Sequence, residues 1–194
     1  MIFNKKKHLM LHILRARSIA RRYLITNGFD GVLAKLGLLM GFRVSAAISI
    51  EVMIGACLGA AVALFMSGLS SAYISEAAEQ QQTLDELRGA MVSDMQDSAH
   101  SRAATVAPVL VALANGGAPL LMGRLIMLPL WLSHLCLDLG VGAIEAALAI
   151  AVVLIFLLGM FLGRVRGSSL LLSGLLTLVI AAVTMGLILL LGTA

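Results

Sequence analysis

The chain contains few charged residues. Only 12% of its 194 residues are Asp, Glu, Lys or Arg, whereas 60% are hydrophobic. A soluble domain is about a quarter charged and about half apolar, so a chain of this length cannot hide this much apolar surface in one soluble core. The low charge therefore excludes an ordinary soluble domain and predicts an integral membrane protein.

Cysteine is also scarce. Cys57 and Cys136 are the only two, and both lie in apolar stretches. Two isolated cysteines exclude a disulfide framework and a cysteine-based metal site. We expect both to be buried free thiols.

The sequence motifs of common enzymes are missing. There is no GxSxG, HExxH, P-loop or dinucleotide fingerprint. The acids are too dispersed along the chain for an intramembrane hydrolase. We therefore expect no enzyme activity and no permanently bound cofactor, and any active transport would be driven by an ion gradient.

Five segments are apolar and long enough to cross a bilayer, which requires about 20 residues. They are 23–42, 48–74, 106–132, 143–162 and 170–191, the third interrupted by Gly116, Gly117, Pro119, Arg124 and Pro129. The long polar segment 75–104 carries Leu84, Leu87, Met91 and Met95 at helical spacing. The sequence thus predicts an all-α membrane domain over 23–194, with five transmembrane helices and an amphipathic cytoplasmic helix after the second span.

Residues 1–22 form a basic arm before the first span. Its positive residues are Lys5, Lys6, Lys7, Arg15, Arg17, Arg21 and Arg22. We expect an amphipathic helix on the membrane surface, held on the cytoplasmic side by its charge. The arm lacks the interleaved aromatic residues of a nucleic-acid-binding segment, so no nucleic-acid partner is expected. Five spans then place the C-terminus outside, in agreement with the low number of basic residues in the outer segments.

Asp30 is an acid inside the first predicted span. A charge there costs roughly 2.5–3.5 kcal/mol on insertion scales, so it marks a candidate ion path. Lys35 follows five residues later, about 140° around a helix, which is unfavourable for a pair within that helix. Pairing with another helix stays open. Asn27 lies one turn before Asp30 and can add an amide oxygen, and this oxygen set suits Mn²⁺ or Fe²⁺.

Further candidate ligands lie in and after the second span. Glu76 and Glu79 share a helix face, although a solvated helix end would look the same. Met66 is a candidate soft ligand, but packing is the commoner role of a membrane methionine. The polar segment adds four residues that could collect metal or simply form a wet helix face: Glu86, Asp94, Asp97 and His100.

Gly55 and Gly59 form a GxxxG pattern in the second span. Small residues at this spacing let two helices approach closely. The pattern favours packing within one chain over a seam between two copies.

Several segments resemble the vacuolar iron transporter family, and most closely its short prokaryotic branch. The first span carries ITNGFDGVL (25–33) and LGLLMG (36–41), and the second span ends in SGLSSAYISEAAE (67–79), followed by LDEL (84–87). DMQDSAHSRA (94–103) and NGGAP (115–119) extend the similarity, which covers about residues 21–192.

The resemblance implies a five-span homodimer in a prokaryotic plasma membrane, with an ion path along its two-fold axis. Such proteins move Fe²⁺ or Mn²⁺ out of the cytosol in exchange for protons. Asp30 would line the path, Glu76 would lie at the cytoplasmic end of the second span, and Glu79 and Glu86 would belong to a metal-collecting helix.

Two departures from the family pattern concern the metal site. Ala72 stands where some members have a methionine, and Lys35 is an unexpected cation that could neutralise Asp30. If it does, the alternative function is a non-transporting membrane scaffold or regulator that keeps the fold.

Overall fold

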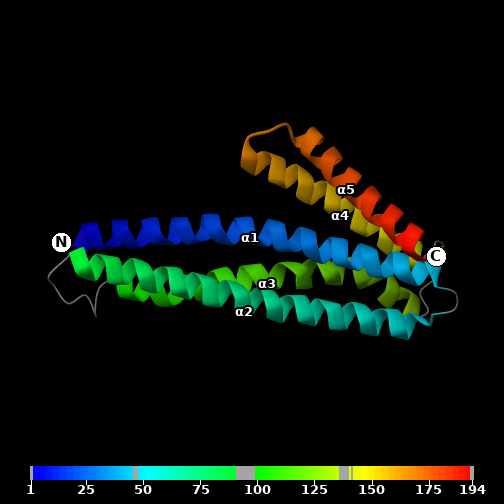
Figure 1. Ribbon diagram of the computed structural model, residues 1–194, viewed down its shortest axis with the longest axis horizontal. Helices are drawn as coiled ribbons and strands as arrows, with labels where there is room; N and C mark the ends of the chain where they lie inside the picture. Colours follow the sequence, from blue (N-terminus) through cyan, green and yellow to red (C-terminus); the bar gives the residue numbers. More distant parts are fainter. Residues whose placement is uncertain (1, 46–47, 91–98, 136–139, 141, 193–194) are drawn as a thin grey trace. The chain divides into compact units, whose positions relative to one another are not determined.

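The computed structural model describes residues 2–45, 48–90, 99–135, 140 and 142–192, with side chains described from residue 19 onward except at 84, 87–90 and 99–105. Five helices make up the regular structure of these residues (Figure 1). They are α1 (Ile2–Val44), α2 (Ile50–Ala90), α3 (Ala99–His134), α4 (Ala143–Arg166) and α5 (Leu170–Gly192). The expected all-α class is confirmed.

Four helical segments are long and apolar enough to cross a membrane: Ile50–Thr83, Val106–His134, Ala143–Arg166 and Leu170–Gly192. The chain therefore has the helices of a membrane protein. α1 is not among the four, because Asn27, Asp30 and Lys35 lower the apolar character of its second half.

α1 runs without a break through the expected boundary between arm and span. Residues 2–22 of the predicted arm are helical and continue into the predicted span, since no proline or glycine interrupts residues 2–27. Residues 75–90 likewise continue α2 instead of starting a helix of their own, and 99–104 form the first turns of α3. Residues 91–98 of the expected cytoplasmic helix lie outside the described residues.

α3 is also continuous. The interruption expected at 115–119 is absent, although Pro108, Pro119 and Pro129 all lie inside the helix. Prolines are tolerated in membrane helices because neighbouring groups can satisfy the backbone that each proline frees.

The chain divides into two compact units. Unit 1 comprises residues 1–24 and 65–117, and unit 2 comprises 25–64 and 118–194. α1, α2 and α3 contribute to both units, whereas α4 and α5 belong to unit 2 alone.

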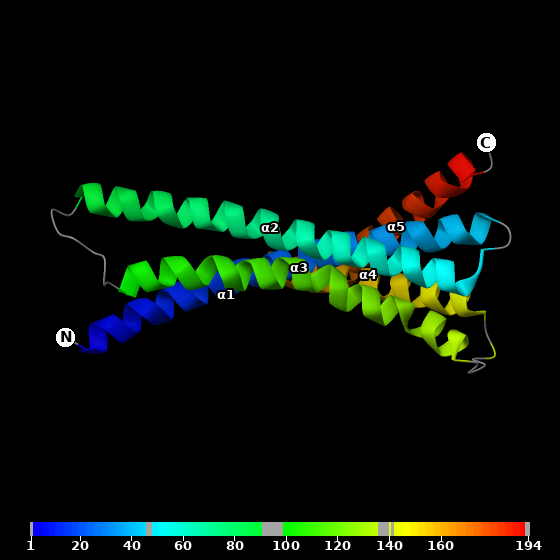
Figure 2. The same ribbon diagram turned by 90° about the horizontal axis from the view of Figure 1, so that it is seen from below.

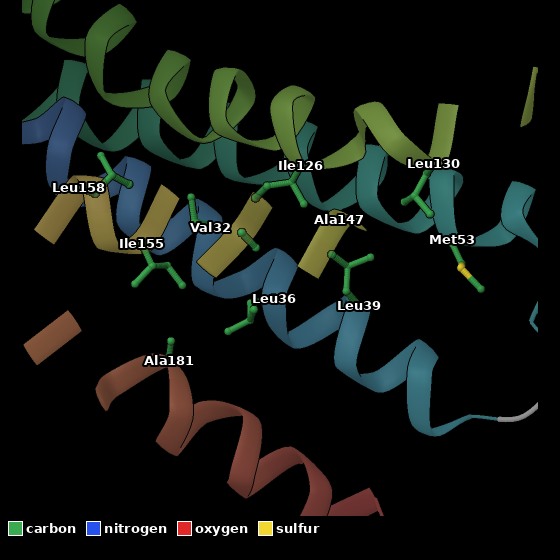
Figure 3. Close-up of a cluster of buried hydrophobic side chains, with 11 residues drawn as sticks. Val32, Leu36, Leu39, Met53, Ile126, Leu130, Ala147, Ile155, Leu158 and Ala181 are labelled. Atoms are coloured by element: carbon green, nitrogen blue, oxygen red, sulfur yellow. The ribbon is translucent and has the colours of Figure 1, made fainter. Parts of the chain in front are cut away.

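The core of unit 2 receives side chains from all five helices (Figure 3). It contains Val32, Leu36 and Leu39 of α1, Met53 of α2, Ile126 and Leu130 of α3, Ala147, Ala151, Ile155 and Leu158 of α4, and Ala181 of α5. Lipid is as apolar as these residues, so their packing stabilises the unit through van der Waals contact.

α4 and α5 form an antiparallel hairpin whose helices lie side by side (Figure 1). Gly167 turns the chain with a positive φ of 72°, which glycine adopts without strain. Thr177 of α5 then donates hydrogen bonds to the carbonyls of Ile155 (3.1 Å) and Gly174 (2.8 Å). At about 35 Å each, the two helices match the roughly 30 Å hydrocarbon core of a bilayer.

Unit 1 is held by a contact between α2 and α3, which lie side by side there (Figure 2). Ala72 of α2 packs with Val111 and Ala112 of α3, and Ile19 and Tyr23 of α1 cover them. Beside this cluster, the buried Asn115 side chain donates a 2.7 Å hydrogen bond from Nδ2 to the Gly68 carbonyl.

Candidate functional site

Asp30 lies on α1 in unit 2, and its side chain is exposed. It forms no ion pair with Lys35 or with any other described residue. The expectation that a five-residue spacing prevents pairing within the helix is therefore confirmed.

Small residues around Asp30 determine which way the acid faces. Gly31 is pressed against Pro119 of α3, where an added Cβ would lie 2.6 Å from the proline Cβ. Gly28 is buried near Met122 of α3 and Leu158 of α4, at 3.7 and 3.9 Å from an added Cβ. Because α1 presents these two glycines to its neighbours, Asp30 between them is directed outward.

Asn27 precedes Asp30 by three residues and is half-buried. Residues at this spacing are neighbours on a helix surface, so the amide and the carboxylate can act on the same ligand. Asn27 already takes part in an interaction within the chain.

Lys35 is buried, whereas Asp30 is exposed. Its side chain is fully buried in unit 2, and Nζ has no hydrogen-bond partner. Gly123 of α3 leaves the space for it, because an added Cβ would lie 2.7 Å from Nζ. The buried thiol of Cys57 on α2 is close enough to interact with the amine electrostatically.

The burial of Lys35 could have been predicted from the spacing of its apolar neighbours in the sequence. Val32, Lys35, Leu36 and Leu39 follow the i, i+3, i+4, i+7 pattern, so Lys35 stands in the apolar stripe of α1. The complementary gap at Gly123 and the nearby Cys57 lie on other helices, and no sequence pattern pointed to them.

The other described candidates lie on α2 in unit 1. Glu76 is buried, and its Oε1 accepts a 3.0 Å hydrogen bond from Gln80 Nε2. Glu79, Glu86 and Met66 are exposed, and Gln82 Nε2 lies 3.5 Å from Glu86 Oε1. Burial distinguishes Glu76 from a merely solvated acid, because a carboxyl group removed from water needs a partner.

The remaining candidates cannot be placed. Asp94 and Asp97 lie outside the described residues, as does Cys136, and His100 begins α3 without a described side chain. Within the described part of the chain, no group of three or more His, Cys, Asp or Glu side chains converges on one metal position. The predicted ligands are divided instead, with Asn27 and Asp30 in unit 2 and the α2 acids with Met66 in unit 1.

Two exposed contacts between a basic and an acidic side chain connect helix ends in unit 2, and the contact at His134 is an ion pair only when the imidazole is protonated. Arg43 Nε of α1 lies 3.2 Å from Glu145 Oε1 of α4, and His134 Nδ1 of α3 lies 3.5 Å from Glu51 Oε1 of α2. Exposed pairs of this kind contribute at most about 1 kcal/mol. Among the acids of unit 2 that the structure describes, Asp30 is the one without such a partner.

Comparisons of the chain with protein-family models, with curated proteins and with solved structures give no significant match. The resemblance to the vacuolar iron transporter family therefore stays a prediction that rests on the residues themselves.

Proposed function

We propose that this protein exports a divalent metal ion, Fe²⁺ or Mn²⁺, from the cytosol in exchange for protons. It would act in a prokaryotic plasma membrane as a homodimer with five spans per chain, the N-terminus in the cytoplasm and the C-terminus outside. The observation that carries the proposal is the exposed Asp30 carboxylate on α1, which has no ion-pair partner among the described residues.

An unpaired carboxylate cannot face hydrocarbon without a large cost in free energy. In a membrane protein it faces a water-filled path, or it is covered by another subunit. A second copy would bring a second Asp30 and a second Asn27, and four oxygen-bearing side chains form a hard ligand set for a divalent cation.

The exposed face of α2 is suited to such a second copy. Gly55 and Gly59 are exposed, and nothing lies within 4 Å of a Cβ built on either residue. The expectation that this GxxxG pattern serves packing within one chain is wrong for unit 2. Small exposed residues at this spacing let the helices of two subunits approach closely.

Protonation supplies the driving force without a nucleotide. A proton on Asp30 or Glu76 removes the negative charge that holds a cation, so the ion is released on the more acidic side. A proton gradient across the membrane then gives the exchange its direction.

The alternative function, a non-transporting scaffold or regulator, depended on neutralisation of Asp30 by Lys35. Lys35 lies in the core of unit 2 and makes no ion pair with Asp30. The absence of this ion pair supports transport over a scaffold.

The test is metal flux into proteoliposomes with an imposed pH gradient, comparing Fe²⁺, Mn²⁺, Zn²⁺ and Ca²⁺. Asp30→Asn keeps the size of the side chain and removes its charge, and we expect the flux to fall about tenfold or more, as when a metal site loses an important partner. Glu145→Gln, which removes an exposed acid of the same unit, is the matched control and should keep the wild-type rate. No flux by the wild type, or equal flux by Asp30→Asn, would contradict the proposal.

A further inference from the structure

Lys35 is a fully buried amine that no described residue satisfies. Its Nζ has no hydrogen-bond partner, and its stem lies against Gly123 of α3. The side chain is held by packing alone, so nothing in the described structure fixes a positive charge at this position.

The groups that face Lys35 offer it no counter-charge. Lys35 shares the buried stripe of α1 with Val32, Leu36 and Leu39, and Gly123 of α3 lies against its side chain. From α2, the Cys57 thiol is the titratable group that interacts with the amine. The described acids of unit 2 are exposed. Asp30 has no ion-pair partner among the described residues, Glu145 pairs with Arg43, and Glu51 contacts His134.

A buried ammonium without partners costs far more free energy than a neutral amine of the same size. The amine can therefore hold a proton when water reaches it, and it must give the proton up when the core closes around it. A transporter opens in turn to the two sides of the membrane. A buried group in such a protein is therefore reached by water and then enclosed again in each cycle.

We propose that Lys35 carries one of the protons that this protein exchanges for a metal ion, an inference that rests on the proposed function. Lys35 follows Asp30 by five residues on α1, or about 7.5 Å along the helix axis. An ammonium at Lys35 and a divalent ion bound at Asp30 carry charges of the same sign on the same helix, so they repel each other. Metal binding thus expels the proton from Lys35, and metal release lets the amine take one up.

The proton balance of the step is simple. The neutral amine binds one proton from the outer side after the metal has left, and it returns that proton to the cytosolic side when the next metal ion binds. No covalent bond other than N–H forms or breaks, and no electron is transferred. Lys35 therefore adds one proton to those exchanged by the carboxylates.

The experiment measures protons and Mn²⁺ together in proteoliposomes that carry a pH dye and a Mn²⁺ dye. Lys35→Met has a side chain of similar size that fits an apolar site, so the variant should fold and move enough Mn²⁺ down a concentration gradient for its ratio of protons to Mn²⁺ to be measured. The number of protons exchanged per Mn²⁺ ion should fall by one. The net charge moved per transport cycle, which is measured from how the flux depends on membrane potential, should change by one. Lys35→Arg cannot release its proton and should lose about tenfold or more of the flux.

A glycine pair provides a second variant and its control. Gly123→Ala places a methyl group where the Lys35 stem lies, so the amine is displaced and the ratio should fall as in Lys35→Met. Gly41→Ala introduces the same methyl group on α1, where nothing lies within 4 Å, and should keep the wild-type ratio.

Protonation can be observed without transport, because the other lysines are Lys5, Lys6 and Lys7. In protein labelled with ¹³C at lysine Cε and embedded in nanodiscs, the signal that disappears in Lys35→Met should move between the amine and ammonium positions as the pH is changed. An unchanged ratio in both Lys35→Met and Gly123→Ala, or a Lys35 signal that does not respond to pH, would overturn the role of Lys35. A wild type that moves no Mn²⁺ would instead contradict the proposed function.

Discussion

Asp30 and Lys35, five residues apart on α1, lie in opposite surroundings, and this difference governs the chemistry open to each. Lys35 belongs to the stripe that α1 buries together with Leu36, whereas Asp30 lies on the exposed side. The acid is therefore available to a cation. The amine is screened from water by the packing of unit 2, and its cost to stability can be measured.

Lys35→Met should make the protein more stable to unfolding. The substitution keeps the buried volume and removes an unsatisfied polar group, whose desolvation costs about 1–3 kcal/mol. Lys35→Ala also removes the amine but leaves a cavity, so it should be less stable than Lys35→Met by about 2 kcal/mol or more. Unfolding of the three proteins in detergent, followed by circular dichroism, measures both differences. A Lys35→Met protein less stable than the wild type would show that the amine has a partner in the folded state.

Close approach of α2 and α3 determines the structure of unit 1 at the scale of helices. A Cβ added to Gly116 would lie 2.6 Å from the Phe65 carbonyl oxygen and 3.1 Å from Leu69, and Asn115 bonds to α2 just beside it. The glycine pair that suggested a break in the sequence is instead part of a continuous helix, and one of its members makes the contact.

Gly116→Ala should weaken this contact by about 1–3 kcal/mol, because the backbone carbonyl of α2 cannot move away without separating the helices. Gly117→Ala is the adjacent control. Nothing lies within 4 Å of its added Cβ, and alanine in a helix is favoured over glycine by up to about 1 kcal/mol, so its stability should be equal or higher. Thermal unfolding of both variants distinguishes them, and equal stabilities would contradict the close packing of α3 on α2.

The helices of the molecule differ widely in length. α4 and α5 have 24 and 23 residues, close to the number that a bilayer requires, whereas α1 and α2 have 43 and 41. Within unit 2, α2 leaves Gly55 and Gly59 uncovered. The assembly that we propose would cover them with a second copy of the chain.

Replacing both Gly55 and Gly59 by leucine should reduce dimer formation about tenfold, or about 1.4 kcal/mol, because the larger side chains prevent close approach of the helices. Gly186→Leu on α5 adds a side chain at another open position and should leave the dimer intact. Photobleaching steps counted on single liposomes give the fraction of dimers. A monomeric wild type would exclude the proposed homodimer, and a double variant as dimeric as the wild type would place the seam elsewhere.

The residues of the candidate site could be predicted only in part. The cost of a charge among apolar residues was enough to single out Asp30, and helix geometry was enough to separate it from Lys35. The burial of Glu76 could not be predicted, because residues at the end of a span can be wet or packed depending on what lies opposite. The space for Lys35 at Gly123 is 88 residues away in the chain, beyond the reach of local patterns.

The sequence by itself determined that this protein is helical and belongs in a membrane, because composition and the length of apolar segments follow from local chemistry. Tertiary structure alone decided which faces of those helices are buried. It directed Asp30 outward, enclosed Lys35 beside Gly123, and left Gly55 and Gly59 uncovered. The physical reason is that the period of a helix fixes the direction in which each side chain leaves the helix axis. Burial depends instead on which neighbouring element lies in that direction.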